Sequence, residues 1–387
     1  MSSMKKVLLV QPSLQPLGGG NAVAVWIIEA LKRENSVSVL TWAPVSVAAI
    51  NRFFGTSLVS SDFRVYYAPR LIRGLIELDP DPHSAQRFAF LMRLCKRMKD
   101  DYDVVITANG EADLGCRGIQ YVHYPWFPRF EPICQKFVDL PWHQRLWGIV
   151  RGQYRPWMAI SGYSFERMKE NLTLVNSDWT GIKCRESYGI ETTTVYPPVP
   201  GLFPDVPWEE REDGFVCIGR ISGEKRLENI INILSEVRLR GKDIHLHIIG
   251  TPGHDMDYYR QVVKKVRENA SWVFLNENLS REELVNLVSR HRYGIHAMHG
   301  EHFGIAVAEM VRAGCIVFVP SEGGQIEIVG GDERLMYETA EEAVEKILCV
   351  MNNSDEQASL RDYLSWRKGL FSAEAFVCRI REIVRRF

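Results

Sequence analysis

Two glutamates and a glycine stand close together in the C-terminal half of the chain, at Glu301, Gly304 and Glu309. They lie between a run that predicts a strand and an apolar, periodic run that predicts a helix. Gly304 would let the backbone come close to a ligand, and the first N–H groups of the helix could bind an anion. Glu309 could accept hydrogen bonds from vicinal hydroxyls, as a ribose offers, and Glu301 could contact a sugar. A capped helix with a charged surface would show the same residues, so both interpretations stay open at this point.

A second candidate group directly follows the predicted strand Phe215–Ile218. It consists of Arg220, in the dipeptide Gly-Arg, and of Lys225, in the tripeptide Glu-Lys-Arg. An arginine at a strand end and a lysine shortly after it could bind both phosphates of a diphosphate. They would also neutralise the charge on a departing nucleoside diphosphate. The neighbouring Arg226 is better explained as a solvated charge before a helix, whereas we assign Arg220 and Lys225 to the site.

The N-terminal half offers weaker candidates. The glycine triplet at 18–20, which includes Gly19 and Gly20, could let the backbone approach a phosphate or a sugar. It is not G-x-G-x-x-G, and no acidic residue closes the second predicted strand at Trp42, so a dinucleotide-binding fingerprint is absent. His123 lies at a predicted strand end and could contact a sugar near its reacting carbon. A single histidine is more often a structural hydrogen-bonding group, and spacing alone does not decide between the two roles.

Three Asp-x-Asp triplets have the form that can hold Mg²⁺ or Mn²⁺ between a diphosphate and the protein. They occupy positions 79–81, 101–103 and 255–257. The first lies in a proline-rich loop, the second precedes a predicted strand, and the third opens a predicted helix. We interpret all three as solvated turn residues. The sequence therefore favours chemistry without a metal ion and without a cofactor.

The composition limits the class of protein. The chain has 387 residues, of which 46% are hydrophobic and 25% charged, and this length favours two globular domains. Lys and Arg number 47 and Asp and Glu 48, so the net charge does not indicate nucleic acid as a partner. The eight cysteines show no C-x-x-C spacing, which argues against a zinc site or a disulfide framework and favours reduced thiols in the cytoplasm. No apolar stretch approaches the length of a membrane helix.

Alternating strand and helix patterns predict an α/β protein with two Rossmann-like domains and parallel sheets. A proline-rich stretch at 196–207 predicts the linker. We predict an N-terminal acceptor domain of residues 1–198 together with a C-terminal helix at 366–387, and a C-terminal donor domain of residues 199–365. Two such domains imply a cleft between them, with ligands at the carboxyl ends of the strands. The predicted strands are 7–10, 37–42, 65–68, 104–107, 118–122, 172–176, 193–195, 215–218, 245–249, 272–275, 293–297 and 316–320, and the later helices are 227–240, 258–269, 281–289, 305–313 and 373–387.

Together these motifs resemble family 4 of the retaining glycosyltransferases, the glycosyl transferases group 1. The E-x₇-E pair of Glu301 and Glu309, the Gly-Arg…Glu-Lys pattern and the N-terminal glycine loop occur in the family's order. Within this family, the blocks YVHYP, VNSDWT, VYPP and YGIHAMHGEHFGIAVAE resemble the α-1,2-mannosyltransferases that extend the dolichol-linked oligosaccharide in asparagine-linked glycosylation. The resemblance implies the GT-B fold, in which two Rossmann-like domains face each other across a deep cleft and a C-terminal helix returns to the N-terminal domain.

The resemblance also implies how the donor diphosphate is bound. Arg220 and Lys225 would contact its phosphates. The backbone N–H groups of Phe303, Gly304 and Ile305 would assist them at the start of the predicted helix.

The remaining implied roles concern the sugar and the ribose. Glu309 would hold the ribose, Glu301 the sugar hydroxyls, and His123 the sugar near its C6 end. Gly19 and Gly20 would line the donor phosphate. Retention would follow a front-face path in which the leaving phosphate oxygen takes the acceptor proton, so no carboxylate nucleophile is needed.

The implied reaction is the transfer of a hexose, in the first place mannose from GDP-mannose, to a hydroxyl of a glycan or lipid-linked acceptor. The alternatives are a UDP-sugar donor on the same fold, as in a glucosyl- or N-acetylglucosaminyltransferase, a sugar-nucleotide epimerase, and a non-catalytic glycan-binding subunit. We expect a cytoplasmic protein without the N-terminal membrane helix of the eukaryotic enzymes. Peripheral membrane contact could involve the basic amphipathic stretch 87–99 or the Trp-, Pro- and Arg-rich stretch 126–157, although an ordinary helix packed on the sheet is favoured for the first.

Overall fold

The computed structural model describes the chain except for residues 1–3, 16–18, 78–83, 127–140, 142–160 and 254. The chain divides into two compact units, which we call the N-terminal unit (Met1–Pro198 with Ala373–Phe387) and the C-terminal unit (Val199–Ser372). The C-terminal unit ends at Ser372, whereas the sequence analysis predicted its end at residue 365. Helix α16 (Ser354–Arg367) runs on into a 3₁₀ turn (Lys368–Phe371) whose last residue is fully buried, so these residues stay with the C-terminal unit.

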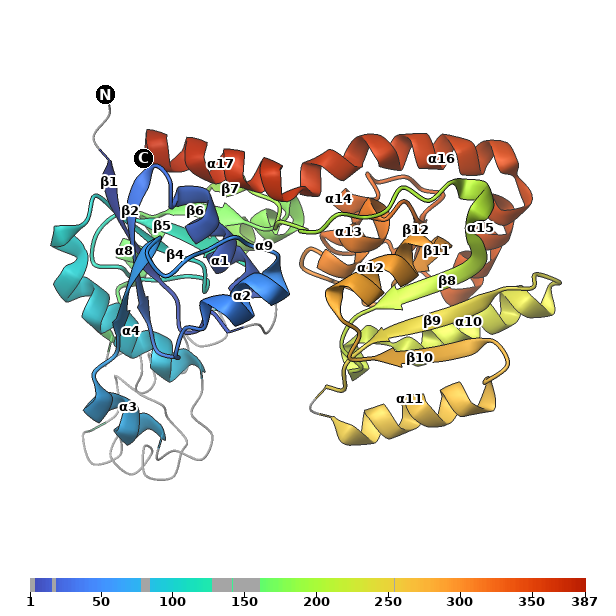
Figure 1. The fold of residues 1–387 in the computed structure, drawn as a ribbon, viewed down its shortest axis with the longest axis horizontal. Helices are drawn as coiled ribbons and strands as arrows, with labels where there is room; N and C mark the ends of the chain where they lie inside the picture. The colour runs from blue at the N-terminus through green and yellow to red at the C-terminus, as the bar shows by residue number, and fades with distance from the viewer. Residues whose placement is uncertain (1–3, 16–18, 78–83, 127–140, 142–160, 254) are drawn as a thin grey trace. The chain divides into compact units, whose positions relative to one another are not determined.

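The N-terminal unit is built on a parallel sheet with the strand order β3-β2-β1-β4-β5-β6-β7 in the described residues (Figure 1). Strand β1 ends in Val7–Val10, which is completely buried, as expected for a sheet with helices on both faces. Its strands are β1 (Lys5–Val10), β2 (Asn35–Thr41), β3 (Phe63–Tyr67), β4 (Val104–Thr107), β5 (Ile119–Val122), β6 (Leu172–Val175) and β7 (Thr192–Thr194), and its first helices are α1 (Gly19–Leu31), α2 (Val47–Phe54), α3 (Arg70–Glu77), α4 (Ser84–Met98), α8 (Phe165–Lys169) and α9 (Asp178–Tyr188).

The last helix of the chain, α17 (Ala373–Arg386), packs on α1 in this unit. Its apolar residues recur at helical spacing and are buried, among them Phe376 and Ile380. Arg381 donates from Nε to the carbonyl of Ala30 at 2.7 Å, which fixes the helix against the end of α1. The predicted return of a C-terminal helix to the N-terminal unit is therefore confirmed.

Helix α4 carries the basic amphipathic stretch that was considered for membrane contact. Its apolar side chains, including Phe88, Leu91 and Met92, are buried in a core cluster with β1 and β4. This supports the interpretation as an ordinary helix packed on the sheet. Most of the stretch 126–157 lies outside the described residues. Among the helices that the structure describes, none has the length and apolar character to cross a bilayer.

The C-terminal unit has a second parallel sheet with the order β10-β9-β8-β11-β12-β13 in the described residues. Both sheets are parallel and alternate with helices along the chain, which confirms the predicted α/β class. The strands are β8 (Glu212–Ile218), β9 (His245–Gly250), β10 (Val273–Glu277), β11 (His291–Ile295), β12 (Ile316–Pro320) and β13 (Met336–Tyr337), and the helices besides α16 are α10 (Leu227–Leu239), α11 (Met256–Glu268), α12 (Arg281–Ser289), α13 (Ile305–Arg312), α14 (Gln325–Ile328) and α15 (Ala340–Asn352).

Candidate active site

The predicted donor residues of the C-terminal unit follow the carboxyl ends of neighbouring strands. Arg220 and Lys225 come after β8, and Glu301 comes after β11. Because β8 and β11 pair in parallel, these segments leave the sheet at the same edge. At that edge the chain after β8 passes so close to the end of β9 that a Cβ on Gly250 would lie 1.9 Å from the carbonyl oxygen of Gly219. Glycine is required there for the two strand ends to meet.

Lys225 and Glu301 form an ion pair at this edge. The distance from Lys225 Nζ to Glu301 Oε2 is 2.5 Å, and each side chain is only 16% exposed. His296, which is almost fully buried, places its Nε2 atom 3.4 Å from the same carboxylate oxygen. The structure thus brings together two of the predicted site residues and adds a third side chain, His296, which the sequence analysis did not single out.

The electrostatics of the pair define the state of Glu301. Burial by itself would raise the pKa of Glu301, but the adjacent His296 and the charge of Lys225 hold the pKa well below its ordinary value. Burial lowers the pKa of His296, so its imidazole is neutral at physiological pH. Glu301 is therefore a permanent carboxylate, which accepts hydrogen bonds and does not donate them.

The backbone around Glu301 is held by the turn that follows β12. The N–H of Gly324 donates to the Glu301 carbonyl at 2.7 Å. Gly323 has φ +108°, and a Cβ there would lie 2.5 Å from that carbonyl oxygen, so only glycine fits. The buried Gln325 donates from Nε2 to the carbonyls of Met298, Pro320 and Glu322. These contacts fix the loop before α13, and sequence reasoning missed them because they join segments that are apart in the chain.

Helix α13 begins directly after Gly304, which has φ +101°. Glycine favours this left-handed conformation, and it provides no side chain to cap the first N–H groups of the helix. Phe303 is buried and its ring lies 5.8 Å from the ring of Phe371. The Phe303 side chain therefore turns into the interior beside the start of α13.

Glu309, on the same helix, is buried and paired with Arg281 at the start of α12. The guanidinium of Arg281 also donates from Nη2 to the carbonyl of Pro200 at 2.6 Å, and it lies over the ring of Phe203 at 5.6 Å. These contacts fix the direction of the Glu309 carboxylate. Arg281 was predicted only as the first residue of a helix, so its contact with the E-x₇-E motif is a finding of the structure.

Arg220 differs from the other donor candidates because its side chain is 64% exposed. Its Nη2 atom lies 3.5 Å from Glu224 Oε1, and the same oxygen accepts a hydrogen bond from Ser222 Oγ at 2.7 Å. The structure gives no direct contact of Arg220 with Lys225 or Glu301. Its long side chain lies at the carboxyl end of β8 and is accessible to an incoming anion.

In the N-terminal unit, Gly19 and Gly20 open helix α1, and Gly18 lies outside the described residues. A Cβ on Gly20 would lie 3.3 Å from His123 Nε2, so the predicted glycine loop and the predicted histidine are in contact. His123 Nε2 donates to the carbonyl of Ala108 at 3.0 Å, and the His123 carbonyl accepts from Asn176 Nδ2 at 3.0 Å. The ring is thereby fixed at the carboxyl end of β5.

Two of the Asp-x-Asp triplets have structural contacts. Asp103 accepts a hydrogen bond from the N–H of Lys6 at 2.7 Å. Asp255 caps helix α11 by accepting from the N–H groups of Asp257 and Tyr258. The triplet at 79–81 lies outside the described residues.

Comparison with known proteins shows which proteins the chain is similar to. Residues 202–365 match the family model described as "Glycosyl transferases group 1". Curated relatives named "GDP-Man:Man(3)GlcNAc(2)-PP-Dol alpha-1,2-mannosyltransferase" include those of mouse (31% identical over 41% of this chain and 36% of the relative), human (27%, over 48% and 42%) and Caenorhabditis elegans (25%, over 61% and 56%). The chain thus matches between about a third and somewhat over half of the length of these relatives.

Solved structures show that the GT-B fold extends over the whole chain. HepE of Anabaena, solved in complex with UDP, has a TM-score of 0.69 at 12% identity and covers 99% of this chain and 100% of that one. WaaG, a glycosyltransferase involved in lipopolysaccharide biosynthesis, has a TM-score of 0.62 at 16% identity over 97% and 99% of the two chains. At these identities the likeness concerns the fold.

Proposed function

Because residues 202–365 belong to the glycosyl transferases group 1, we propose that the chain is a retaining glycosyltransferase. The proposed reaction transfers mannose from GDP-mannose to a hydroxyl of a glycan or lipid-linked acceptor. The observation that carries the proposal is the Lys225–Glu301 pair at the carboxyl ends of β8 and β11. A cation and a carboxylate stand there beside the N-terminus of α13, where a diphosphate-linked sugar needs them.

Lys225 and Arg220 are assigned to the donor diphosphate. A lysine ammonium has three donors, so Lys225 can keep its contact with Glu301 and still bind a phosphate oxygen. The exposed Arg220 can turn towards the phosphates and bind them through two parallel hydrogen bonds. The backbone N–H groups of Phe303–Ile305, where α13 begins, would complete the anion site.

Glu309 is assigned to the ribose, whose vicinal hydroxyls can donate to a carboxylate. Its Oε1 atom is used by Arg281, and the second oxygen is the one we assign to the ribose. Glu301 is assigned to the sugar hydroxyls, as an acceptor that stays ionised. His123, Gly19 and Gly20 are assigned to the C6 end of the sugar and to the donor phosphate on the strength of the sequence resemblance.

The proposed chemical step retains the configuration at C1 of the sugar. The bond between C1 and the phosphate oxygen breaks, and a bond between C1 and the acceptor oxygen forms on the same face. The acceptor proton passes to the leaving phosphate oxygen, so atoms and charge balance without a protein nucleophile. The role of the protein is to stabilise the charge that develops on the phosphate, and Lys225 and Arg220 are the side chains that supply it. No metal ion is part of this proposal.

A UDP-sugar is the second candidate donor, because HepE of Anabaena was solved with UDP. Thermal-shift and calorimetric titrations of the full chain with GDP, UDP, ADP, GDP-mannose and UDP-glucose, each with EDTA and with Mg²⁺, separate the two. Selective binding of GDP and GDP-mannose supports the proposal. Preference for a uridine donor removes the mannose assignment and keeps the reaction class. If no nucleotide binds to the folded chain, the enzyme proposal fails.

We also propose that the protein acts on the cytoplasmic side of a membrane that holds its acceptor. The described cysteines are free thiols, as expected in a reducing compartment; they are Cys95, Cys116, Cys184, Cys217, Cys315, Cys349 and Cys378. Sedimentation with vesicles that contain anionic lipid, at low and at high salt, tests peripheral contact. Protein that stays in the supernatant at low salt would contradict the membrane part of this proposal.

A further inference from the structure

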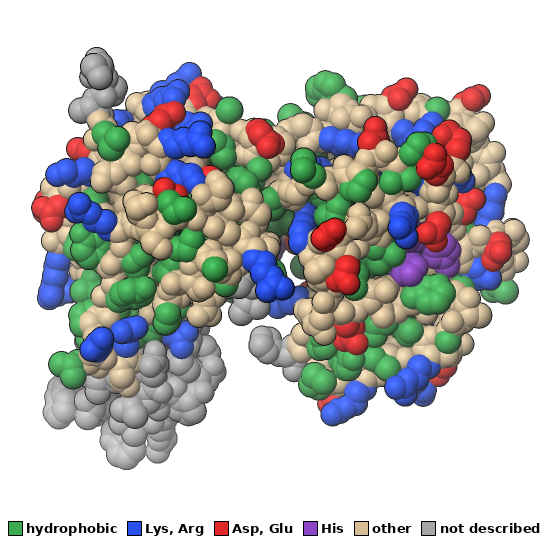
Figure 2. Space-filling model, in the orientation of Figure 1, with side chains coloured by type: hydrophobic (Ala, Val, Ile, Leu, Met, Phe, Trp, Pro, Cys, Tyr) green, Lys and Arg blue, Asp and Glu red, His purple; other side chains and the backbone are tan. Residues whose placement is uncertain are grey.

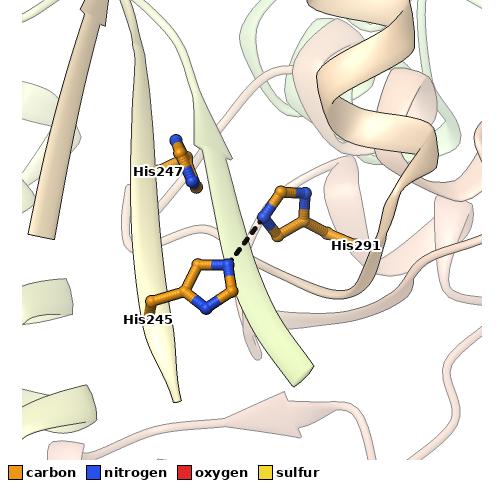
Figure 3. Close-up of side chains that lie close together, drawn as sticks. All are labelled: His245, His247 and His291. Carbon is orange, nitrogen blue, oxygen red and sulfur yellow. Dashed lines mark hydrogen bonds between the residues drawn. The ribbon is translucent and has the colours of Figure 1, made fainter. Parts of the chain in front are cut away.

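Three histidines lie together at the amino-terminal edge of the C-terminal sheet, opposite to the edge that carries the candidate active site (Figure 3). His245 and His247 are on β9, and His291 is the first residue of β11. The nitrogen atoms that each ring can offer to a ligand all lie within 4.8 Å of one another. This cluster plays no part in the proposed transfer reaction.

The sheet is shaped to let these rings meet. Strand β8 lies between β9 and β11, and Gly214 of β8 is paired with His245. A Cβ on Gly214 would lie 2.3 Å from His245 Nε2, so any side chain there would exclude the ring. The ring of His245 therefore crosses the β8 backbone and reaches His291, whose Nε2 atom is 2.9 Å from that of His245.

The outward nitrogens of two rings are already held by oxygen acceptors. His291 donates from Nδ1 to the Leu287 carbonyl at 2.7 Å, and His247 donates from Nδ1 to Asn276 Oδ1 at 2.8 Å. Both rings therefore carry their lone pair on Nε2, and that of His291 faces His245 Nε2 at 2.9 Å. Histidines that bind metals are held in the same way, with one nitrogen on the metal and the other N–H on a carbonyl or amide oxygen.

An acidic side chain lies beside His245 at the outer end of this cluster. Glu212, the first residue of β8, places Oε2 at 3.4 Å from His245 Nε2, and its side chain is 51% exposed. His291 is fully buried, so the cluster runs from the core to the surface, where Figure 2 shows histidine side chains in purple and where an ion can enter. The ring of Phe274, which is itself 42% exposed, stacks on His247 at 4.9 Å.

We propose that His245, His247 and His291, completed by Glu212, bind a divalent transition-metal ion, for which Zn²⁺ fits the donor set best. Three imidazole nitrogens and one carboxylate oxygen form a usual four-coordinate zinc set. Tetrahedral bonds of about 2.0–2.1 Å place ligand nitrogens about 3.3 Å apart. The separations of the histidine nitrogens, from 2.9 Å to at most 4.8 Å, bracket that value, and the half-exposed Glu212 would turn towards the ion as the fourth ligand.

The ion would join three neighbouring strands, β8, β9 and β11, at their amino ends. Its role would be structural, because the carboxyl ends of the same strands carry the proposed donor site. The cysteine pattern gave no indication of such a site, since none of its ligands is a cysteine. The donor proposal neither supports this one nor depends on it.

The test uses the untagged full chain, stripped with EDTA and dialysed. We expect it to bind one equivalent of Zn²⁺ by calorimetry and elemental analysis, and to give the visible absorption of tetrahedral cobalt with Co²⁺. The double variant His245→Gln/His247→Gln should lose that absorption and stoichiometric binding, whereas His299→Gln, a histidine of the same unit outside the cluster, should keep both. Asn276→Ala should weaken the affinity about tenfold, because the orienting acceptor of His247 is lost.

Unfolding of the chain with and without metal provides the second readout. Zn²⁺ should raise the Tm of the wild type and of His299→Gln, and not that of the double variant. If the double variant fails to fold, two milder variants take its place. Glu212→Gln removes the charge of a half-exposed side chain, and Asn276→Ala removes the oxygen that holds His247, so both should bind Zn²⁺ more weakly than the wild type. Equal Zn²⁺ affinity of the wild type and of these variants, or a wild type without stoichiometric binding, would overturn the proposal.

Discussion

Replacing Lys225 by alanine tests the ion pair and the proposed donor site in one variant. The side chain of Lys225 contacts Glu301 at 2.5 Å and also lies 3.3 Å from the sulfur of Met298. Without it, the neutral His296 is the side-chain partner that remains for the Glu301 carboxylate among the described residues. A charge that is largely shielded from water then has no opposite charge nearby, so both stability and anion binding should suffer.

The expected magnitudes follow from burial. Loss of one partner of a buried ion pair costs about 3–5 kcal/mol, and we expect about 3 kcal/mol. The lower value applies because each side chain is 16% exposed, so water can reach Glu301. This corresponds to a fall in Tm of roughly 6–12 °C for a unit of this size. Loss of a hydrogen bond to a charged phosphate costs about 1.5–3 kcal/mol, which weakens GDP-mannose binding about 10- to 150-fold.

Urea unfolding and calorimetric GDP-mannose titration measure the two effects. The matched control is Lys264→Ala on α11, since that lysine is 80% exposed and its stability effect should stay within about 0.5 kcal/mol. Adding Glu301→Gln to Lys225→Ala should restore part of the stability, because the uncompensated charge is then removed. If Lys225→Ala has the stability of Lys264→Ala and binds GDP-mannose as the wild type does, the reasoning about this pair is refuted.

Three further predictions concern the same site. The pKa of Glu301 is lowered in the folded protein, so its ionised form stabilises the fold fully at neutral pH. This stabilisation is lost as the pH drops below the ordinary value of 4.5. Urea midpoints of the wild type should therefore fall more steeply towards about pH 3 than those of Glu301→Gln. Gly323→Ala should lower the free energy of unfolding in urea by about 2–4 kcal/mol, because the new Cβ would collide with the backbone of Glu301. Its control is Gly241→Ala, which also has a positive φ but open space around it and should lower this free energy by about 1 kcal/mol. Arg281→Ala should raise the KM for the nucleotide-sugar about tenfold, since Glu309 loses its orientation; an unchanged KM would contradict this.

Most strands of both sheets could be predicted because their sequences are short, β-branched runs, whereas the two-residue strand β13 was not predicted. The predicted strand 104–107 coincides with β4, and 316–320 coincides with β12. The helices α15 and α16 were not predicted. They follow the last motif, and α16 has little amphipathic pattern, since only Leu360 and Leu364 are buried.

The sequence predicted the motif residues of the candidate site, but it did not predict the side chains that contact them. Glu301, Lys225 and Glu309 stand at spacings that a linear pattern records. Arg281, which fixes Glu309, lies on another helix, and His296 forms its contact through the fold of the loop after β11. The three-histidine cluster is likewise spread over two strands that are separated by a third, so no local spacing reveals it.

The state of the two acids bears on the proton transfer in the proposed reaction. Glu301 is held as a carboxylate with a lowered pKa, which makes it a weak base and leaves it no proton to give. Glu309 is bound to Arg281 and fixed in place. Neither suits a general base for the acceptor hydroxyl, whereas both suit the binding of hydroxyl groups. Within the donor site of the C-terminal unit, the departing diphosphate therefore supplies the basic oxygen that takes the acceptor proton. The pairing of the acids with cations therefore favours the front-face path over one that uses a carboxylate of this unit as base or nucleophile.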